Sequence, residues 1–281
     1  MGVLTANKPA ASSQAYVTLL TNDAYLPGAI ALLRSLRLTG TQADQVVLYT
    51  DGVSPERLSE LDILGARLIK TKLLEVSDAF RRTHRRDNLH AAAPFTKGRK
   101  PDFHTPLANF CKLRLWQLTD YADIVFLDAD VIVVRNIDIL FDYPEYSAAP
   151  NVYESLGDFH RLNSGVFTAK PSEDTFANML TALDKPGIFW PRTDQTFLQS
   201  YFPDWHGLPI FFNLLQYVWF NLPDLWNWDS VKVIHYQYEK PWEIDHPRAD
   251  DLRPLIDLWR AYHDGSAIPD LSHLSPPGGS G

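Results

Sequence analysis

One short apolar run constrains the fold most: Ile124–Leu127, which ends directly in the acidic triplet Asp128, Ala129 and Asp130. Uninterrupted apolar residues predict a strand buried on both faces, as in the centre of a parallel sheet. About one such acidic triplet is expected by chance in a chain of this size, so its position carries the information. Ligands of open parallel sheets bind beyond the carboxyl ends of the strands, and carboxylates buried there are costly unless paired or metal-bound.

Strands and helices alternate through the first half of the chain. Short β-branched and aromatic runs predict strands over Ala15–Leu20, Val46–Tyr49 and Arg67–Ile69. Apolar residues at helical spacing predict helices over Tyr25–Leu38 and Ser54–Leu64, the second beginning with a serine cap and a proline. This order is typical of an α/β fold built on a mostly parallel sheet.

The second half is less regular but continues in the same style. Helices are predicted over Ala108–Leu118, Asp174–Leu183 and Asp250–Tyr262, and strands over Ser164–Ala169 and Val231–His235. We find neither an internal repeat nor a linker between the halves. A single domain is therefore predicted.

Length and composition agree with one globular domain. The chain has 281 residues, of which 45% are hydrophobic, a typical globular composition. The domain is predicted over residues 15–265, between a flexible N-terminal segment (1–14) and a flexible, low-complexity tail (266–281).

Charge and targeting features narrow the function classes. The net charge of −8 argues against nucleic acid as a partner, and the single Cys111 excludes an internal disulfide and a multi-cysteine zinc site. No apolar stretch reaches the roughly 18 residues of a membrane span, and Met1–Gln14 does not resemble a signal peptide. We therefore expect a cytoplasmic protein.

Residues 81–100 contain seven Lys or Arg residues and little apolar periodicity. A solvated loop is one interpretation. The other is a flap whose cations face an anionic ligand, and a peripheral contact with an anionic membrane is a further alternative.

Five motifs occur in an order that resembles a known family. They are Thr18–Tyr25, Leu127–Phe141, Leu162–Phe167, Asp194–Gln195 and Ile234–Trp242. The sequence thereby resembles glycosyltransferase family 8, and within it the glycogenins and galactinol synthases. The resemblance implies a GT-A fold with a Rossmann-like central sheet flanked by helices. It also implies a divalent cation, UDP-glucose or UDP-galactose as donor, and retention of the anomeric configuration.

By this resemblance, Asp128, Asp130 and His235 hold the metal, with Ala129 between the two acids, and the metal bridges the donor diphosphate. Two carboxylates suit Mg²⁺ or Mn²⁺, and the imidazole favours Mn²⁺. Lys240 matches a lysine that meets the diphosphate, where its charge stabilises the departing UDP.

The same resemblance assigns the nucleotide side of the site. Leu19, Thr21, Asn22 and Tyr25 match positions that cradle the base and ribose, and Lys112 matches a lysine near the donor. A helix cap at Asn22 and a core tyrosine at Tyr25 are the structural alternatives, and the Asn22 turn is compatible with both.

The sugar side of the site is assigned in the same way. Asn163 and Ser164 match residues that contact the transferred sugar, and Asp194 and Gln195 match an acid–glutamine pair beside the anomeric carbon. Asp194 is then a nucleophile, an oxocarbenium stabiliser or a positioning group. A same-face reaction, in which the departing phosphate deprotonates the acceptor, is the alternative.

Two departures bear on the details. Between His235 and Lys240 the glycogenins have a glycine where this chain has Gln237 or Tyr238, and the segment is one residue shorter. Phe220 stands where glycogenin carries the tyrosine that it glucosylates, although Tyr217 is nearby.

The predicted function is therefore transfer of a hexose from a UDP-sugar to a separate small acceptor, a polyol such as inositol or a sugar. A self-glucosylating primer, a transferase with a lipid acceptor and a silent nucleotide-sugar-binding scaffold are the alternatives. Trp219, Trp226 and Trp228 are predicted to pack in the core, with an acceptor groove or a homodimer interface as the alternative.

Overall fold

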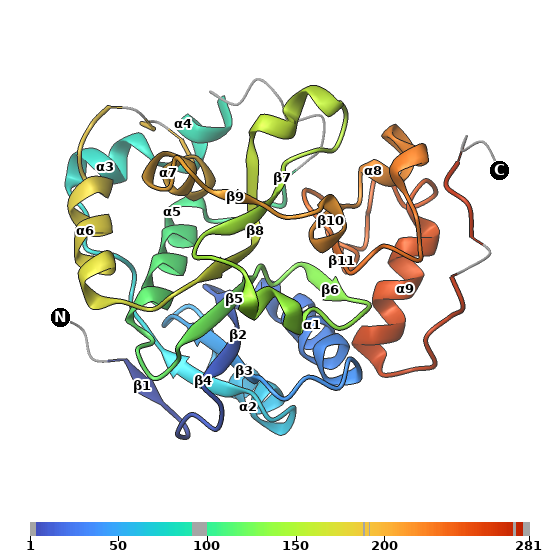
Figure 1. The fold of residues 1–281 in the computed structure, drawn as a ribbon, viewed down its shortest axis with the longest axis horizontal. Helices are drawn as coiled ribbons and strands as arrows, with labels where there is room; N and C mark the ends of the chain where they lie inside the picture. Colours follow the sequence, from blue (N-terminus) through green and yellow to red (C-terminus); the bar gives the residue numbers. More distant parts are fainter. Residues whose placement is uncertain (1–3, 92–99, 188, 191, 272–273, 278–281) are drawn as a thin grey trace.

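The computed structural model describes residues 4–91, 100–187, 189–190, 192–271 and 274–277. Within these ranges an eight-stranded sheet has the strand order β1-β4-β3-β2-β5-β8-β7-β9, and a three-stranded sheet has the order β10-β11-β6. Figure 1 shows the smaller sheet beside α9 and α1. No helix in the described ranges is both long and apolar enough to cross a bilayer.

The strands have the following bounds: β1 Thr5–Ala6, β2 Gln14–Leu20, β3 Asp44–Tyr49, β4 Arg67–Lys70, β5 Asp123–Leu127, β6 Val131–Val133, β7 Ser147–Pro150, β8 Leu162–Ala169, β9 His206–Gly207, β10 Leu214–Leu215 and β11 Val233–His235. The α-helices are α1 Leu26–Leu38, α2 Pro55–Ile63, α3 Asp78–Thr83, α4 Arg86–Ala91, α5 Pro106–Asn109, α6 Glu173–Leu183, α7 Asp194–Tyr201, α8 Val218–Asn221 and α9 Arg253–Asp264. The 3₁₀ helices are η1 Asp23–Tyr25, η2 Phe110–Gln117, η3 Asp138–Asp142, η4 Leu156–His160, η5 Ile210–Phe212 and η6 Pro223–Leu225.

The central strands β4, β3, β2 and β5 are parallel, whereas β8 pairs antiparallel with β5 and with β7. The predicted α/β class with a largely parallel sheet is confirmed, and the antiparallel half beyond β5 refines it. Because β2 and β5 run parallel, their carboxyl ends open at the same edge of the sheet.

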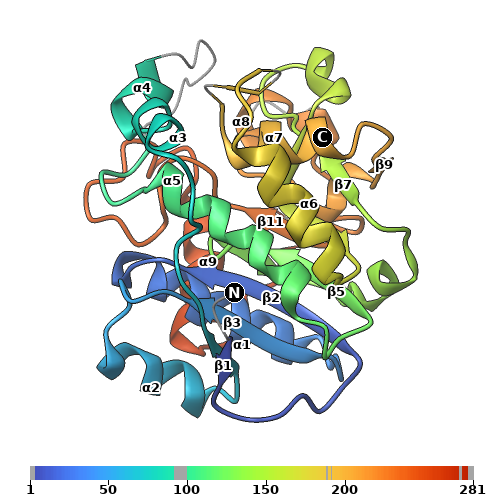
Figure 2. The ribbon, with the colours of Figure 1, turned by 90° about the vertical axis from the view of Figure 1, so that its left-hand side faces the viewer.

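Both faces of the sheet are covered, as the apolar strands predict. On β2, Ala15 and Val17 pack in the cluster formed with η2 and α6, whereas Tyr16 packs with Leu32 and Leu36 of α1. Successive side chains of a strand point to opposite faces. Figure 2 accordingly shows α6 on one side of the strands and α1 and α2 on the other.

Two predicted elements differ in detail from the structure. The helix expected over Ala108–Leu118 is a short α5 followed by the 3₁₀ helix η2. Segment 81–100 is not simply a loop, because it holds the end of α3 and all of α4. Its residues 92–99 lie outside the described ranges.

The segments at both ends of the chain contact the fold. Within 1–14, β1 pairs antiparallel with β4, and in the tail Leu271 and Leu274 pack against the cluster of Trp219, Trp226 and Trp228. These tryptophans are all buried, so their predicted core packing is confirmed.

Candidate active site

A cavity of ≈ 270 Å³ lies where β2 and β5 end. It gathers every residue that the sequence assigned to the metal, the donor or the sugar, except Asn22. The assigned residues that line it are Leu19, Thr21, Tyr25, Lys112, Asp128, Ala129, Asp130, Asn163, Ser164, Asp194, Gln195, His235 and Lys240. Residues that are far apart in sequence therefore line the same cavity.

Strand pairing brings the three predicted metal ligands together. The acidic triplet joins β5 to β6, and β6 pairs antiparallel with β11 so that Val131 lies opposite His235. The Tyr236 N–H donates to the Asp130 carbonyl oxygen at 2.9 Å. One ligand atom from each of Asp128, Asp130 and His235 lies within 4.8 Å of the others, so the cluster can hold a metal ion.

A buried chain of amides fixes the orientation of His235. The Gly165 N–H can only donate, so the Asn163 atom that it meets at 2.8 Å is Oδ1, and Asn163 Nδ2 then donates to Asn151 Oδ1 at 2.8 Å. Asn213 Nδ2 also donates to Asn163 Oδ1 at 2.8 Å, which leaves Asn213 Oδ1 facing His235 Nδ1 at 3.0 Å.

This amide chain decides which ring nitrogen of His235 is available. An amide oxygen only accepts, so His235 Nδ1 carries a proton and donates to Asn213. Nε2 faces Asp130 Oδ1 at 3.3 Å: a protonated Nε2 donates to that carboxylate, and an unprotonated one offers its lone pair to a cation. Such outer hydrogen bonds orient histidine ligands in metal sites. The arrangement thus presents Nε2 to the carboxylate cluster.

Gly165→Ala is expected to disturb this arrangement. A Cβ at residue 165 would overlap the His235 ring and approach Asn163 Oδ1 at 2.9 Å. Overpacking of this kind costs about 1–3 kcal/mol, and displacement of the ring should weaken Mn²⁺ binding. Urea unfolding and calorimetric Mn²⁺ titration measure the two effects. Gly207→Ala is the control, because its Cβ meets nothing within 4 Å.

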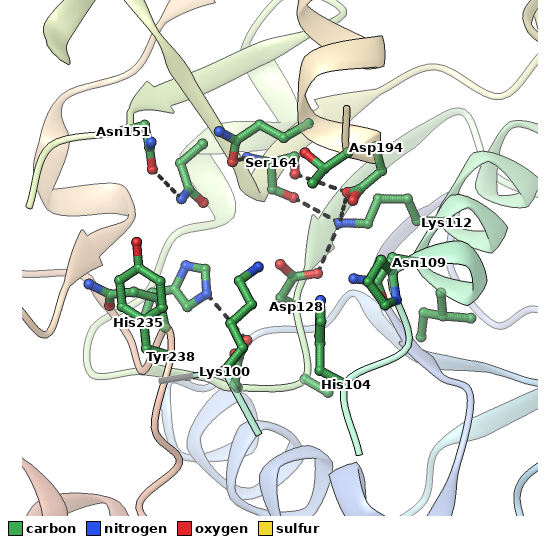
Figure 3. Close-up of a pocket in the computed structure, with 18 of the residues that line it drawn as sticks. Lys100, His104, Asn109, Lys112, Asp128, Asn151, Ser164, Asp194, His235 and Tyr238 are labelled. Atoms are coloured by element: carbon green, nitrogen blue, oxygen red, sulfur yellow. Dashed lines mark hydrogen bonds and ion pairs between the residues drawn. The ribbon is translucent and has the colours of Figure 1, made fainter. Parts of the chain in front are cut away.

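Two buried lysines compensate the acids in the cavity. Lys112 Nζ lies 3.1 Å from Asp128 Oδ1 and 2.8 Å from Asp194 Oδ2, and Lys240 Nζ lies 2.5 Å from Asp130 Oδ2. Figure 3 shows Lys112 between Asp128 and Asp194. The two lysines that were predicted to lie near the nucleotide-sugar donor, Lys112 and Lys240, are therefore held by the carboxylates beside them.

These ion pairs move the pKa values of both partners. Burial opposes the charge on Asp130, but Lys240 and His235 outweigh it, so the pKa of Asp130 lies well below its usual value. Burial also opposes the charge on Lys112, but Asp128 and Asp194 outweigh it and raise its pKa. Both groups are thus charged at neutral pH.

The sugar side of the cavity is organised around Ser164. Its hydroxyl donates to Asp194 Oδ2 at 3.2 Å, and its N–H donates to Gln195 Oε1 at 3.3 Å. Asp194 begins α7, whose N-terminus favours a carboxylate electrostatically. The acid–glutamine pair is thereby fixed against β8.

On the nucleotide side, the predicted residues bind a neighbouring segment. Asn22 Oδ1 accepts from the Ala24 N–H and caps η1, while its Nδ2 donates to the Phe103 carbonyl oxygen at 3.1 Å. The structural interpretation of Asn22 as a cap therefore holds. Tyr25 lines the cavity, and its hydroxyl lies 3.1 Å from His104 Nδ1.

Among the lining residues, Lys100 belongs to the basic segment 81–100, whose cations the flap interpretation directs at an anionic ligand. Sequence reasoning missed several others: Pro101, His104, Pro106, Asn109, Asn151, Tyr153, Arg161, Arg192, Thr193 and Thr196. They come from turns and short helices, which carry no periodic signal. Figure 3 shows Lys100 directed into the cavity, where burial and the charge of Lys240 lower its pKa.

Tyr238, between His235 and Lys240, has an unusual backbone conformation. Its φ of 64° lies in the left-handed region that favours glycine. The ring lines the cavity and packs against Tyr153 and Tyr217, with centroid distances of 5.9 and 5.2 Å. Aromatic packing thus holds a tyrosine in a backbone conformation that usually favours glycine.

The model of the family described as "Glycosyl transferase family 8" matches residues 16–245. The chain belongs to this family. The expected GT-A fold is confirmed by solved glycosyltransferase structures. GlyE of Streptococcus pneumoniae gives a TM-score of 0.62 at 20% identity and covers 95% of this chain and 62% of its own. The galactosyltransferase LgtC, solved with donor and acceptor sugar analogues, gives a TM-score of 0.58 at 14% identity, with 91% and 98% covered.

Curated relatives at higher identity carry two different names. A putative UDP-glucuronate:xylan α-glucuronosyltransferase 5 of Arabidopsis thaliana is 36% identical over 237 residues, which are 81% of this chain and 36% of the relative. Human glycogenin-1 is 35% identical over 244 residues, which are 84% of this chain and 64% of the relative. The chain thus spans about a third of the plant relative and under two thirds of glycogenin-1.

Proposed function

We propose that this family 8 protein is a retaining, metal-dependent hexosyltransferase. It transfers glucose or galactose from a UDP-sugar to a hydroxyl of a separate small acceptor, a polyol such as inositol or a sugar. One observation carries the proposal: a metal-binding trio, two buried lysines and the Asp194–Gln195 pair line a single cavity.

The donor set fits a divalent cation. Asp128 and Asp130 supply carboxylate oxygens and His235 supplies Nε2, a combination that suits Mn²⁺. When bound, the cation supplies Lewis-acid stabilisation of charge on the diphosphate. Lys240, beside Asp130, adds a positive charge at the same place, where it stabilises the negative charge that builds up on the leaving group.

Asp194 is the residue that we assign to the reacting face of the sugar. Lys112 Nζ and the Ser164 hydroxyl both contact its Oδ2, at 2.8 and 3.2 Å. A carboxylate fixed in this way can stabilise an oxocarbenium-like centre or attack it. Asn163 and Ser164 are assigned to the transferred sugar, and Gln195 is assigned with Asp194 to the anomeric carbon.

A separate acceptor is favoured over the protein itself. Phe220 has no hydroxyl, and Tyr217, 1% exposed, donates its hydroxyl to buried Glu239 Oε2 at 2.8 Å. Self-glucosylation at either position would need an exposed tyrosine hydroxyl.

The lone Cys111, buried and without a disulfide among the described residues, is compatible with the cytoplasmic location that we propose.

A donor and acceptor screen tests the proposal. UDP release is measured with Mn²⁺, Mg²⁺ or a chelator, using UDP-glucose, UDP-galactose and UDP-glucuronate against polyols, sugars and lipid extracts. We expect Mn²⁺-dependent release with a hexose donor and a polyol or sugar, and an unchanged intact mass of the protein. Absence of both binding and hydrolysis of every donor would refute the proposal. A mass increase by hexose units would indicate a self-modifying primer, and release only with lipid extracts a lipid acceptor.

A further inference from the structure

Arg86, on α4, directs its guanidinium at backbone carbonyl oxygens of the segment that follows the basic region. Its Nη1 lies 2.8 Å from the oxygen of Pro101, 3.1 Å from that of Asp102 and 2.7 Å from that of His104, and its Nη2 lies 3.3 Å from that of Lys100. A guanidinium offers five donors in one plane. One side chain therefore spans the whole turn.

These carbonyl oxygens, rather than a carboxylate, are the partners that matter. The Asp102 carboxylate lies 3.7 Å from Arg86 Nη2 and is 89% exposed, and exposed ion pairs of this kind contribute little. Hydrogen bonds from a charged donor are stronger than neutral ones. Arg86 is thus bonded to the chain itself, whereas Lys100 is the cation of segment 81–100 that is directed into the cavity.

The segment that Arg86 holds, residues 100–105, forms one wall of the active-site cavity. Lys100, Pro101 and His104 line the cavity, and the segment is also bonded to the predicted nucleotide residues. Asn22 donates to the Phe103 carbonyl oxygen, and the Tyr25 hydroxyl bonds to His104. The segment is therefore fixed between α4 on one side and the end of β2 with η1 on the other.

We propose that Arg86 is a positioning residue for the nucleotide-sugar donor, acting through segment 100–105. The inference rests on the proposed function for the identity of the ligand. The set of hydrogen bonds from Arg86 to segment 100–105, called the Arg86 clamp below, is a property of the ligand-free protein. Without Arg86, the carbonyl oxygens of the turn lose the guanidinium donor and the wall that carries Lys100 and His104 loosens. The metal ligands and Asp194 have no contact with Arg86, so donor binding should suffer more than the chemical step.

The test compares Arg86→Met with Arg85→Met. Arg85 is exposed and lies in the bend just before α4. Hydrogen–deuterium exchange without ligand follows the amides of His104, Ala108 and Asn109, which close the turns at Pro101 and Thr105. We expect these amides to exchange at least about tenfold faster in Arg86→Met, with the central strands unchanged. Arg85→Met should match the wild type.

Calorimetric UDP titration with Mn²⁺, and steady-state kinetics, measure the consequence for the donor. The UDP Kd and the donor KM should rise about tenfold in Arg86→Met, with kcat within about threefold of wild type. Arg86→Lys, which keeps the charge but not the fork, should give an intermediate KM, and it replaces the methionine variant if that variant does not fold.

Three outcomes would overturn the proposal: wild-type UDP affinity in Arg86→Met, a fall in kcat at constant KM, or faster exchange spread evenly over the whole protein. Failure of the proposed function would look different. Wild-type protein would then bind no UDP-sugar, which removes the donor role, while local exchange at residues 100–109 would still report the clamp.

Discussion

Asp130→Asn should reduce UDP-sugar turnover by about a thousandfold or more, because metal stabilisation of several kcal/mol is lost from the transition state. Asp130 lies 3.3 Å from His235 Nε2 and 2.5 Å from Lys240 Nζ, so the amide also removes the partner of two other site residues. Calorimetry should show weaker Mn²⁺ binding. Wild-type turnover, or wild-type Mn²⁺ affinity, would contradict the assignment.

The same substitution should lower stability while the fold is kept. Removal of one member of a buried ion pair costs about 3–5 kcal/mol, and Lys240, bonded to the Tyr236 carbonyl oxygen at 2.8 Å, would lose its opposite charge at Asp130. Urea unfolding measures the loss, and Asp251→Asn, at an exposed pair with Arg248, is the control. Because the folded pKa of Asp130 is lowered, its contribution is complete above about pH 4 and is lost as the pH falls through the folded pKa.

Lys112→Met is the second substitution with a large expected effect. It leaves Asp128 and Asp194 without their shared cation, and the free energy of unfolding should fall by about 3–5 kcal/mol. Turnover should fall as well, because the Asp194 carboxylate is no longer held. Lys170→Met removes an ammonium that is 56% exposed and lies 3.4 Å from Asp123, so it should change stability by less than about 1 kcal/mol.

The sign of the pH dependence tests Lys112 independently. Its pKa is raised in the folded state, so its contribution to the free energy of unfolding is complete below the unfolded value of about 10.4 and is lost as the pH rises through the folded pKa.

A second mutation, Asp194→Asn, should recover part of the stability lost in Lys112→Met, since the two sites are coupled. Equal stability of Lys112→Met and wild type at neutral pH would refute the account.

The strands and the metal cluster could be predicted because each depends on local pattern and chain order. The apolar run before Asp128 predicted β5, and the edge of a parallel sheet predicted where the acids would lie. His235 needed the family resemblance, since its place beside Asp130 depends on the pairing of β6 with β11. The 3₁₀ form of η2 has the same apolar spacing as a short α-helix and was not distinguishable.

The amide chain and the Arg86 clamp could not be predicted from the sequence for a different reason. Asn151, Asn163 and Asn213 are separated by many residues, and an isolated asparagine is as typical of a turn as of a buried relay. Arg86 bonds to carbonyl oxygens, which every residue possesses, so no side-chain pattern marks its partners. Contacts of this kind follow only from the three-dimensional fold.

The acidic triplet also connects the two sheets, since β5 belongs to the larger sheet and β6 and β11 belong to the smaller one. A cation held by Asp128, Asp130 and His235 would therefore cross-link one sheet to the other. A ligand that binds only the folded state raises stability by RT ln(1 + [L]/Kd). The melting temperature of this protein thus becomes a simple gauge of site occupancy, with which metals and nucleotide-sugars can be ranked before any acceptor is known.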